Sequence, residues 1–102
     1  MSLYNHHVLE LTEVISSRLS DGSGLAAMVV AASGAVGMFA LGPPQVRAGP
    51  RGIAVGMLCR DGHIVLHTRP EEGLCVVDIL ARAPTDVARG LEVIARRLTA
   101  PG

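Results

Sequence analysis

His63 and His67, two histidines four residues apart, are the first candidates for chemistry in this sequence. On a helix, their rings would converge on one metal ion. The apolar residues 64–68 instead predict a strand, on which the two rings share a face but lie ~13 Å apart. Metal–nitrogen bonds are only about 2 Å long, so we expect no metal site. His67 is either hydrogen-bonded within the sheet or part of a pocket.

Asp78 is an unusual acidic residue, because it lies inside the apolar segment of residues 74–80. A carboxylate in such a place needs a charged or hydrogen-bonding partner. Arg69 and Arg82 are the candidate partners, and we favour a structural ion pair with one of them over a catalytic role. Glu71 follows a proline in a predicted turn, where a solvated side chain is expected.

The composition excludes several classes of protein. All nine basic residues are arginine and nine acidic residues balance them, so the net charge is zero and lysine Schiff-base chemistry is excluded. A neutral chain with 2% aromatic residues lacks the positive patch and the stacking surface that nucleic-acid binding needs. Cys59 and Cys75 form no metal or redox motif and are expected to be reduced thiols.

The longest uninterrupted apolar run covers residues 25–32, which is far too short to span a membrane. The first residues show no basic segment followed by an apolar one, as a signal peptide would. We therefore expect a cytoplasmic protein that does not bind a membrane.

Hydrophobic periodicity and turn residues predict the elements that must position these side chains. Strands are expected over residues 7–11, 36–41, 53–59, 64–68 and 74–80. Helices are expected over residues 25–32, with Gly34 as the natural end, and over residues 87–98, after a start signal at 83–86. A helical turn within residues 12–20 and a proline-rich loop over residues 42–51 complete the pattern.

Asp61 and Gly62 lie between two predicted strands and indicate a tight β-hairpin. A type I′ turn centred on them would have positive φ at both positions, which these residue types tolerate. The order of elements predicts an α+β fold in one domain, residues 1–102: a two-layer αβ sandwich with a mainly antiparallel sheet and two helices on one face. Because residues 74–80 are apolar on both sides, we expect a homodimer in which a second copy covers the other sheet face.

Residues 61–82, DGHIVLHTRPEEGLCVVDILAR, resemble the signature of the bacterial and archaeal S-adenosylmethionine decarboxylase proenzymes. Residues 6–11, HHVLEL, are similar to the opening strand of that family. The resemblance implies an αβ sandwich that dimerises and a role in spermidine synthesis. It also implies self-cleavage at a serine, which leaves the pyruvoyl group that serves as cofactor for decarboxylation.

The sequence departs from the family pattern at the positions that carry this chemistry. The self-cleaving serine falls on Gly62, and the glutamate before it falls on Asp61. A second serine implicated in processing falls on Ala54, and the cysteine that donates a proton falls on Arg82. The tryptophan of the signature is Arg69. Without a side chain at position 62 there is no nucleophile, so no pyruvoyl cofactor can form.

Other positions of the signature are kept. The retained residues are Glu10, His67, Thr68, Pro70, Glu71, Gly73 and Asp78. Among them, the resemblance implies that Glu10, His67 and Glu71 belong to a ligand pocket. We therefore expect an unprocessed homologue without decarboxylase activity, which binds an adenosyl or polyamine ligand or regulates a paralogous decarboxylase subunit.

Two alternative functions stay open at this stage. The chain could be an enzyme with altered chemistry in the same pocket, using His67 and Glu71 as an acid–base pair. It could also be a scaffold domain whose apolar sheet face binds another protein.

Overall fold

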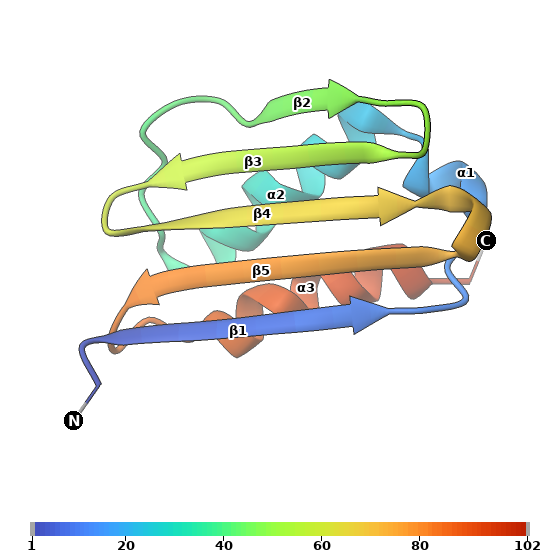
Figure 1. Cartoon of the computed structure of the whole chain (residues 1–102). Helices are drawn as coiled ribbons and strands as arrows, with labels where there is room; N and C mark the ends of the chain where they lie inside the picture. The colour runs from blue at the N-terminus through green and yellow to red at the C-terminus, as the bar shows by residue number, and fades with distance from the viewer. Residues whose placement is uncertain (1, 102) are drawn as a thin grey trace.

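The computed structural model of the chain describes residues 2–101, which form five strands, three α-helices and one short 3-10 helix. Along the chain the elements are β1 (Tyr4–Leu11), α1 (Ser16–Leu19), α2 (Gly22–Val36), β2 (Gln45–Ala48), β3 (Ile53–Cys59), β4 (Gly62–Arg69), η1 (Pro70–Glu72), β5 (Leu74–Arg82) and α3 (Val87–Thr99). The strands form one antiparallel sheet in the order β1-β5-β4-β3-β2 (Figure 1).

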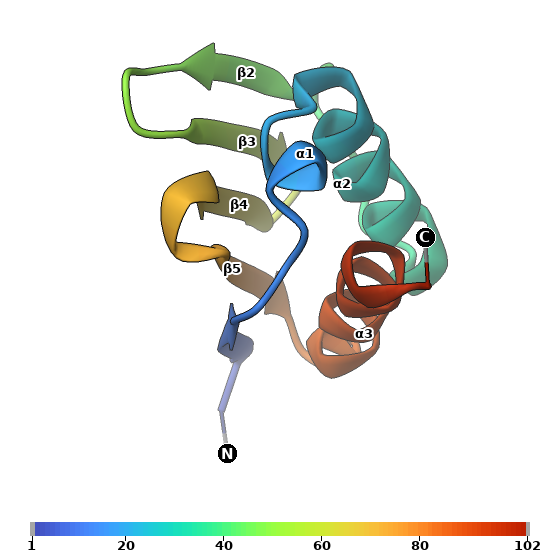
Figure 2. The ribbon, with the colours of Figure 1, turned by 90° about the vertical axis from the view of Figure 1, so that its right-hand side faces the viewer.

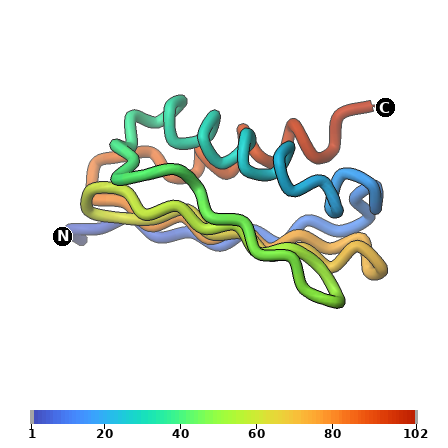
Figure 3. Tube along the Cα trace, turned by 90° about the horizontal axis from the view of Figure 1, so that it is seen from above, coloured from blue at the N-terminus to red at the C-terminus, as the bar shows by residue number. Residues whose placement is uncertain are grey.

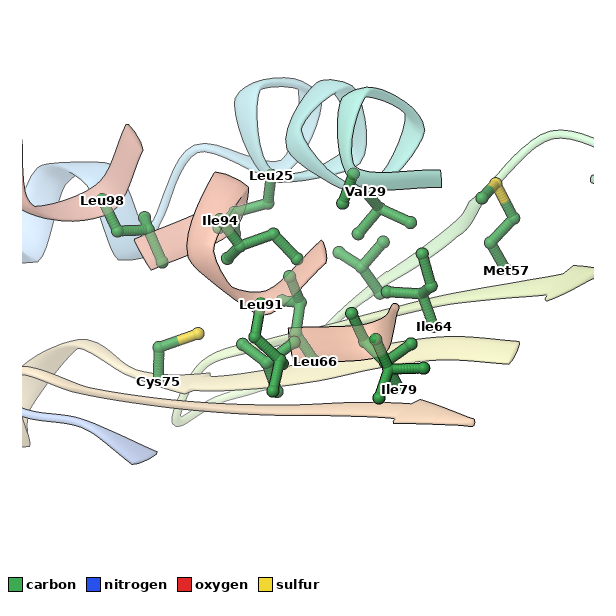
Figure 4. Packing of buried hydrophobic residues seen from close by; sticks show 14 of the residues in the cluster. Leu25, Val29, Met57, Ile64, Leu66, Cys75, Ile79, Leu91, Ile94 and Leu98 are labelled. Atoms are coloured by element: carbon green, nitrogen blue, oxygen red, sulfur yellow. The ribbon is translucent and has the colours of Figure 1, made fainter. Parts of the chain in front are cut away.

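The two long helices lie on the same face of the sheet, behind it in Figure 1 and to one side of it in Figures 2 and 3. Their apolar side chains pack against the sheet; Leu25 and Val29 of α2 and Ile94 of α3 are fully buried there (Figure 4). No helix within residues 2–101 covers the opposite face of the sheet (Figure 3). The predicted α+β sandwich with two helices on one face is therefore confirmed.

Helix α2 is longer at both ends than the predicted helix over residues 25–32, because it begins at Gly22 and ends at Val36. The Asp21 side chain accepts a hydrogen bond from the backbone N–H of Gly24, which caps the first turn. The helix then continues past Gly34 to Val36, and Gly37 caps it with a φ of +74°, the left-handed conformation that terminates helices. The predicted end at Gly34 and the predicted strand over residues 36–41 are wrong. The only strand-like pairing within residues 36–41 is an isolated β-bridge between Ala40 and Cys59.

Strand β2 lies inside the segment that was expected to be a loop. The residue pairing Val46↔Val55 attaches it to β3 at the edge of the sheet. The prolines of residues 42–51 flank these four residues and do not interrupt them. A short strand at an edge needs only one hydrogen-bonded neighbour, so the prolines beside it do no harm.

The turn between β3 and β4 differs from the predicted one. Cys59 pairs with Gly62, so Arg60 and Asp61 are the two turn residues. Asp61 has a φ of +60°, whereas Gly62 does not have a positive φ and is already the first residue of β4. The expectation of a type I′ turn centred on Asp61 and Gly62 is therefore wrong.

Helix α3 agrees with its pattern. The Asp86 side chain accepts a hydrogen bond from the backbone N–H of Arg89, and the last turn carries Arg96 and Arg97 at the negative end of the helix dipole. None of the helices within residues 2–101 is long and apolar enough to cross a membrane.

Candidate functional site

The sheet face that α2 and α3 leave uncovered, here called the open face, carries most of the candidate residues. Every second residue of each strand points to this face, and the register aligns these residues across neighbouring strands. Its residues are Tyr4, His6, Val8, Glu10, Gln45, Arg47, Ala54, Gly56, Leu58, His63, Val65, His67, Arg69, Leu74, Val76, Asp78, Leu80 and Arg82. The face is thus a mixture of apolar side chains and charges of both signs.

Asp78 lies in the middle of the open face between two histidines. His6 Nε2 is 3.0 Å from Asp78 Oδ1 and 3.1 Å from Oδ2, and His63 Nε2 is 3.0 Å from Oδ1. We call these three residues the His–Asp–His cluster. The predicted partners are elsewhere: Arg69 pairs with Glu72 at 3.1 Å, and Arg82 stacks on Tyr4. The expected ion pair of Asp78 with an arginine is therefore wrong.

The strand register explains the cluster. His6 of β1 and His63 of β4 both pair with Leu80, two residues along β5 from Asp78. Each histidine therefore reaches the carboxylate diagonally across the sheet, from opposite sides. No local sequence pattern identifies His6 as a partner of Asp78, because this contact depends on which strands become neighbours.

The electrostatics of the cluster favour an ionised Asp78. Partial burial acts to raise the pKa of this carboxyl, but hydrogen bonds from His6 and His63, together with their positive charge, outweigh burial and lower the pKa below its usual value. Within residues 2–101, no group of three or more His, Cys, Asp or Glu side chains is arranged to hold a metal ion. The contacts and charges describe a hydrogen-bonded ion pair.

The three expected pocket residues, Glu10, His67 and Glu71, lie in different places. Glu10 and His67 both pair with Val76 of β5, from opposite sides, so they stand about two strand spacings (~10 Å) apart. His67 lines a hollow on the open face, whereas Glu71, in η1, lines a neighbouring one. Residues 49–53 border both hollows.

The positions that would carry self-cleavage hold no hydroxyl or thiol group. Gly62 lies against β5, where a β-carbon built on it would be 2.0 Å from the backbone oxygen of Leu80. Ala54 lies on the open face, between Arg47 and His67 in the register. Arg82 is exposed at the end of β5, with its guanidinium 5.4 Å from the centre of the Tyr4 ring.

The two cysteines do not replace the missing proton donor. Cys75 and Cys59 are both buried, and Cys75 belongs to the core on the helix side of the sheet (Figure 4). Burial raises the pKa of the Cys75 thiol to about 11 and also raises the pKa of Cys59. The alternation of β5 puts Cys75 and Arg82 on opposite faces of the sheet.

Comparison with known proteins agrees with this arrangement of strands and signature residues. The family description of S-adenosylmethionine decarboxylase matches residues 5–101. The chain belongs to the S-adenosylmethionine decarboxylase family. A relative from Symbiobacterium thermophilum, named an S-adenosylmethionine decarboxylase proenzyme, is 30% identical over 78 residues, which are 76% of this chain and 59% of the relative. The match thus spans well under two thirds of that relative's length.

A solved structure of the same family shares the fold. The crystal structure of the adenosylmethionine decarboxylase from Aquifex aeolicus VF5 superimposes with a TM-score of 0.85 and covers 94% of this chain and 80% of that one. The sequence identity is 20%, so the likeness concerns the fold. Membership of the S-adenosylmethionine decarboxylase family, inferred from residues 61–82 and 6–11, is confirmed.

Proposed function

We propose that this member of the S-adenosylmethionine decarboxylase family stays unprocessed, forms no pyruvoyl group and has no decarboxylase activity. It then acts as a non-catalytic ligand-binding or regulatory subunit related to polyamine synthesis. The observation that carries the proposal is at position 62, where a glycine lies so close to Leu80 that a β-carbon would be 2.0 Å from its carbonyl oxygen.

The chemistry of self-cleavage gives this observation its weight. A serine at this position would supply the oxygen that attacks the preceding peptide carbonyl, and Gly62 has no such atom. Without that attack there is no ester and no ketone group to hold the substrate amine. The residues present therefore do not fit a pyruvoyl cofactor.

The residue at the proton-donor position supports the same proposal. The Arg82 guanidinium keeps its proton at any physiological pH, so it cannot act as a general acid. The two thiols of the described chain are buried away from the open face. Decarboxylation would leave a carbanion, and neither the Arg82 guanidinium nor a buried thiol could protonate it.

The open face supports a homodimer as the functional form. Val8 and Leu58 lie on it with 54% and 70% of their surface exposed, and Leu74, Val76 and Leu80 of β5 are only partly buried. Two copies that stack their open faces would remove this apolar surface from water. A paralogous decarboxylase subunit is the other partner that such a surface would accept, and the test below separates the two.

Intact mass spectrometry of the purified chain tests the central claim. A single species near 10.6 kDa that does not react with borohydride supports an unprocessed chain. Two fragments whose masses add up to that of the chain, or carbon dioxide release from S-adenosylmethionine by pure protein, would falsify the proposal. Sedimentation velocity of the same sample shows whether the chain forms a dimer with itself, and a monomer would favour a second protein as its partner.

A further inference from the structure

A hollow of about 610 Å³ opens on the open face beside the β2–β3 hairpin, and three arginines and a histidine are among its lining residues: Arg47, Arg51, Arg69 and His67. We infer that this arginine hollow binds a small anion, a molecule that carries phosphate or carboxylate groups. The inference goes beyond the proposed function, because it does not depend on whether the chain cleaves itself.

The hollow exists because a small residue of β3, Ala54, lies between two larger residues of the neighbouring strands. Arg47 of β2 pairs with Ala54 of β3, and Ala54 pairs with His67 of β4, so a single methyl group separates the Arg47 and His67 side chains. Small residues also make up much of the hairpin beside it, between Ala48 and Gly52. These small residues leave room for the hollow, and the larger basic side chains line it.

The hairpin that carries Arg51 is fixed to the rest of the sheet. The Gly49 N–H donates to the Gly52 carbonyl at 2.8 Å, which closes the turn. Gly52 approaches β4 so closely that a β-carbon on it would be 1.8 Å from the Thr68 carbonyl oxygen. The buried Thr68 hydroxyl accepts from the Ile53 N–H at 3.0 Å. These contacts hold one wall of the hollow in place before any ligand arrives, which favours binding.

The charge of the hollow is strongly positive. Arg47 donates to the Val46 carbonyl at 3.0 Å and to Gln45 Oε1 at 3.1 Å, contacts that orient its guanidinium without neutralising it. Arg69 is the only one of the three arginines with an ion pair within residues 2–101, to Glu72 at 3.1 Å. Among the residues that the structure describes, no Asp or Glu lines the hollow, and Glu71 lines the neighbouring one.

This charge decides which ligand fits. Polyamines are cations, and the sulfonium group of an adenosyl donor is one as well, so both would meet repulsion from these side chains. A guanidinium is planar and offers paired N–H donors that match a carboxylate or phosphate. An acidic ligand in the hollow would accept hydrogen bonds from Arg47 and Arg51 together, and His67 would line the other side of it.

Calorimetric titration of the full chain with pyrophosphate, and with citrate as the carboxylate probe, tests the inference. We expect binding at low ionic strength, weakening with added salt, and none for putrescine. Arg51→Gln and Arg47→Gln should each weaken binding at least about tenfold, because each removes a charged hydrogen-bond donor. Arg97→Gln removes the same charge from exposed α3, far along the chain from the hollow, and should leave affinity within about twofold.

Several outcomes would overturn the anion site. They are absence of binding by both anions, equal losses in Arg51→Gln and Arg97→Gln, or tighter binding of putrescine than of either anion. Thermal unfolding of each variant verifies that the fold is kept, as expected for exposed side chains. The mass of the same sample keeps the two ideas separate: a cleaved chain contradicts the proposed function alone, whereas an intact chain that ignores anions contradicts this inference alone.

Discussion

Gly62 at the start of β4 lies in such close contact with Leu80 of β5 that a β-carbon on the glycine would be 2.0 Å from the leucine carbonyl oxygen. The same β-carbon would be 3.0 Å from the Cα of Ala81. All of these neighbours are backbone atoms, which cannot move aside as the end of a flexible side chain can. The strand pairing of this chain thus uses the space that a nucleophilic side chain would occupy.

The first prediction concerns Gly62→Ser. Because the added atoms collide with backbone, this change should lower the free energy of unfolding by about 1–3 kcal/mol, as overpacking does. It should also leave the chain uncleaved, since Ala54 still stands at the position of the second serine that the resemblance implicates in processing. Urea unfolding and intact mass measure the two effects.

Gly56→Ser is the matched control for this experiment. Gly56 is also a strand glycine, but the nearest atom to a β-carbon there is Val65 Cγ2 at 4.0 Å, an ordinary contact. Gly56→Ser should therefore lower the free energy of unfolding much less than Gly62→Ser does. Equal stabilities of the two variants, or spontaneous cleavage of Gly62→Ser, would show that position 62 has more room than its contacts indicate.

Much of the fold could be predicted from the sequence because local signals were strong there. The apolar runs on both sides of Asp61, the helix start signal at residues 83–86 and the helical spacing of residues 87–98 all agreed with the three-dimensional structure. The errors arose where tertiary contacts decided the outcome. Gly34 is compatible with a helix end, but Gly37 is the residue with the left-handed backbone.

The candidate site was harder to predict than the fold. His67 and Asp78 were found because they stand out in apolar strands, whereas His6 was missed as a partner of Asp78. That contact joins the two ends of the sequence through β1–β5 pairing, which no local pattern specifies. The arginine hollow was missed for the same reason, because Arg47 and Arg51 come from a segment that was expected to be a loop, and only tertiary contacts place them beside β4.

The second prediction concerns the proposed homodimer. Leu58→Asp should convert the dimer to a monomer, because Leu58 is 70% exposed on the open face and would place a charge in the interface. Sedimentation velocity measures the change. Val30→Asp on α2, where the side chain is 49% exposed, is the control and should remain dimeric. A wild-type chain that is monomeric at all concentrations would contradict the dimer.

The third prediction concerns the thiols. With a pKa of about 11, Cys75 has about one thiolate per ten thousand molecules at pH 7, and its burial blocks access as well. Cys59 and Cys75 should therefore resist a disulfide reagent in the folded protein and both react after unfolding. Leu58→Cys, with its exposed position, should react at once and serves as the positive control. Rapid labelling of the native chain would show that a thiol is available for chemistry after all.

The fourth prediction concerns pH and the His–Asp–His cluster. The pKa of Asp78 is lowered in the folded state, so the folded protein holds the ionised form more strongly than the unfolded chain does. The stabilisation is complete above the usual pKa of 3.8 and is lost as the pH falls through the lowered value. Asp78→Asn should therefore cost about 1 kcal/mol at neutral pH, a modest value because the cluster is partly exposed.

Urea unfolding of wild type and Asp78→Asn over a range of pH provides the measurement. The difference between the two proteins should shrink toward zero in strong acid, where the wild-type carboxyl is also protonated. Asp61→Asn provides a control for the loss of an acidic residue, because Asp61 forms no ion pair within residues 2–101. It should change stability at neutral pH much less than Asp78→Asn. If the difference for Asp78→Asn persisted unchanged in strong acid, the histidines would not be stabilising an ionised carboxylate.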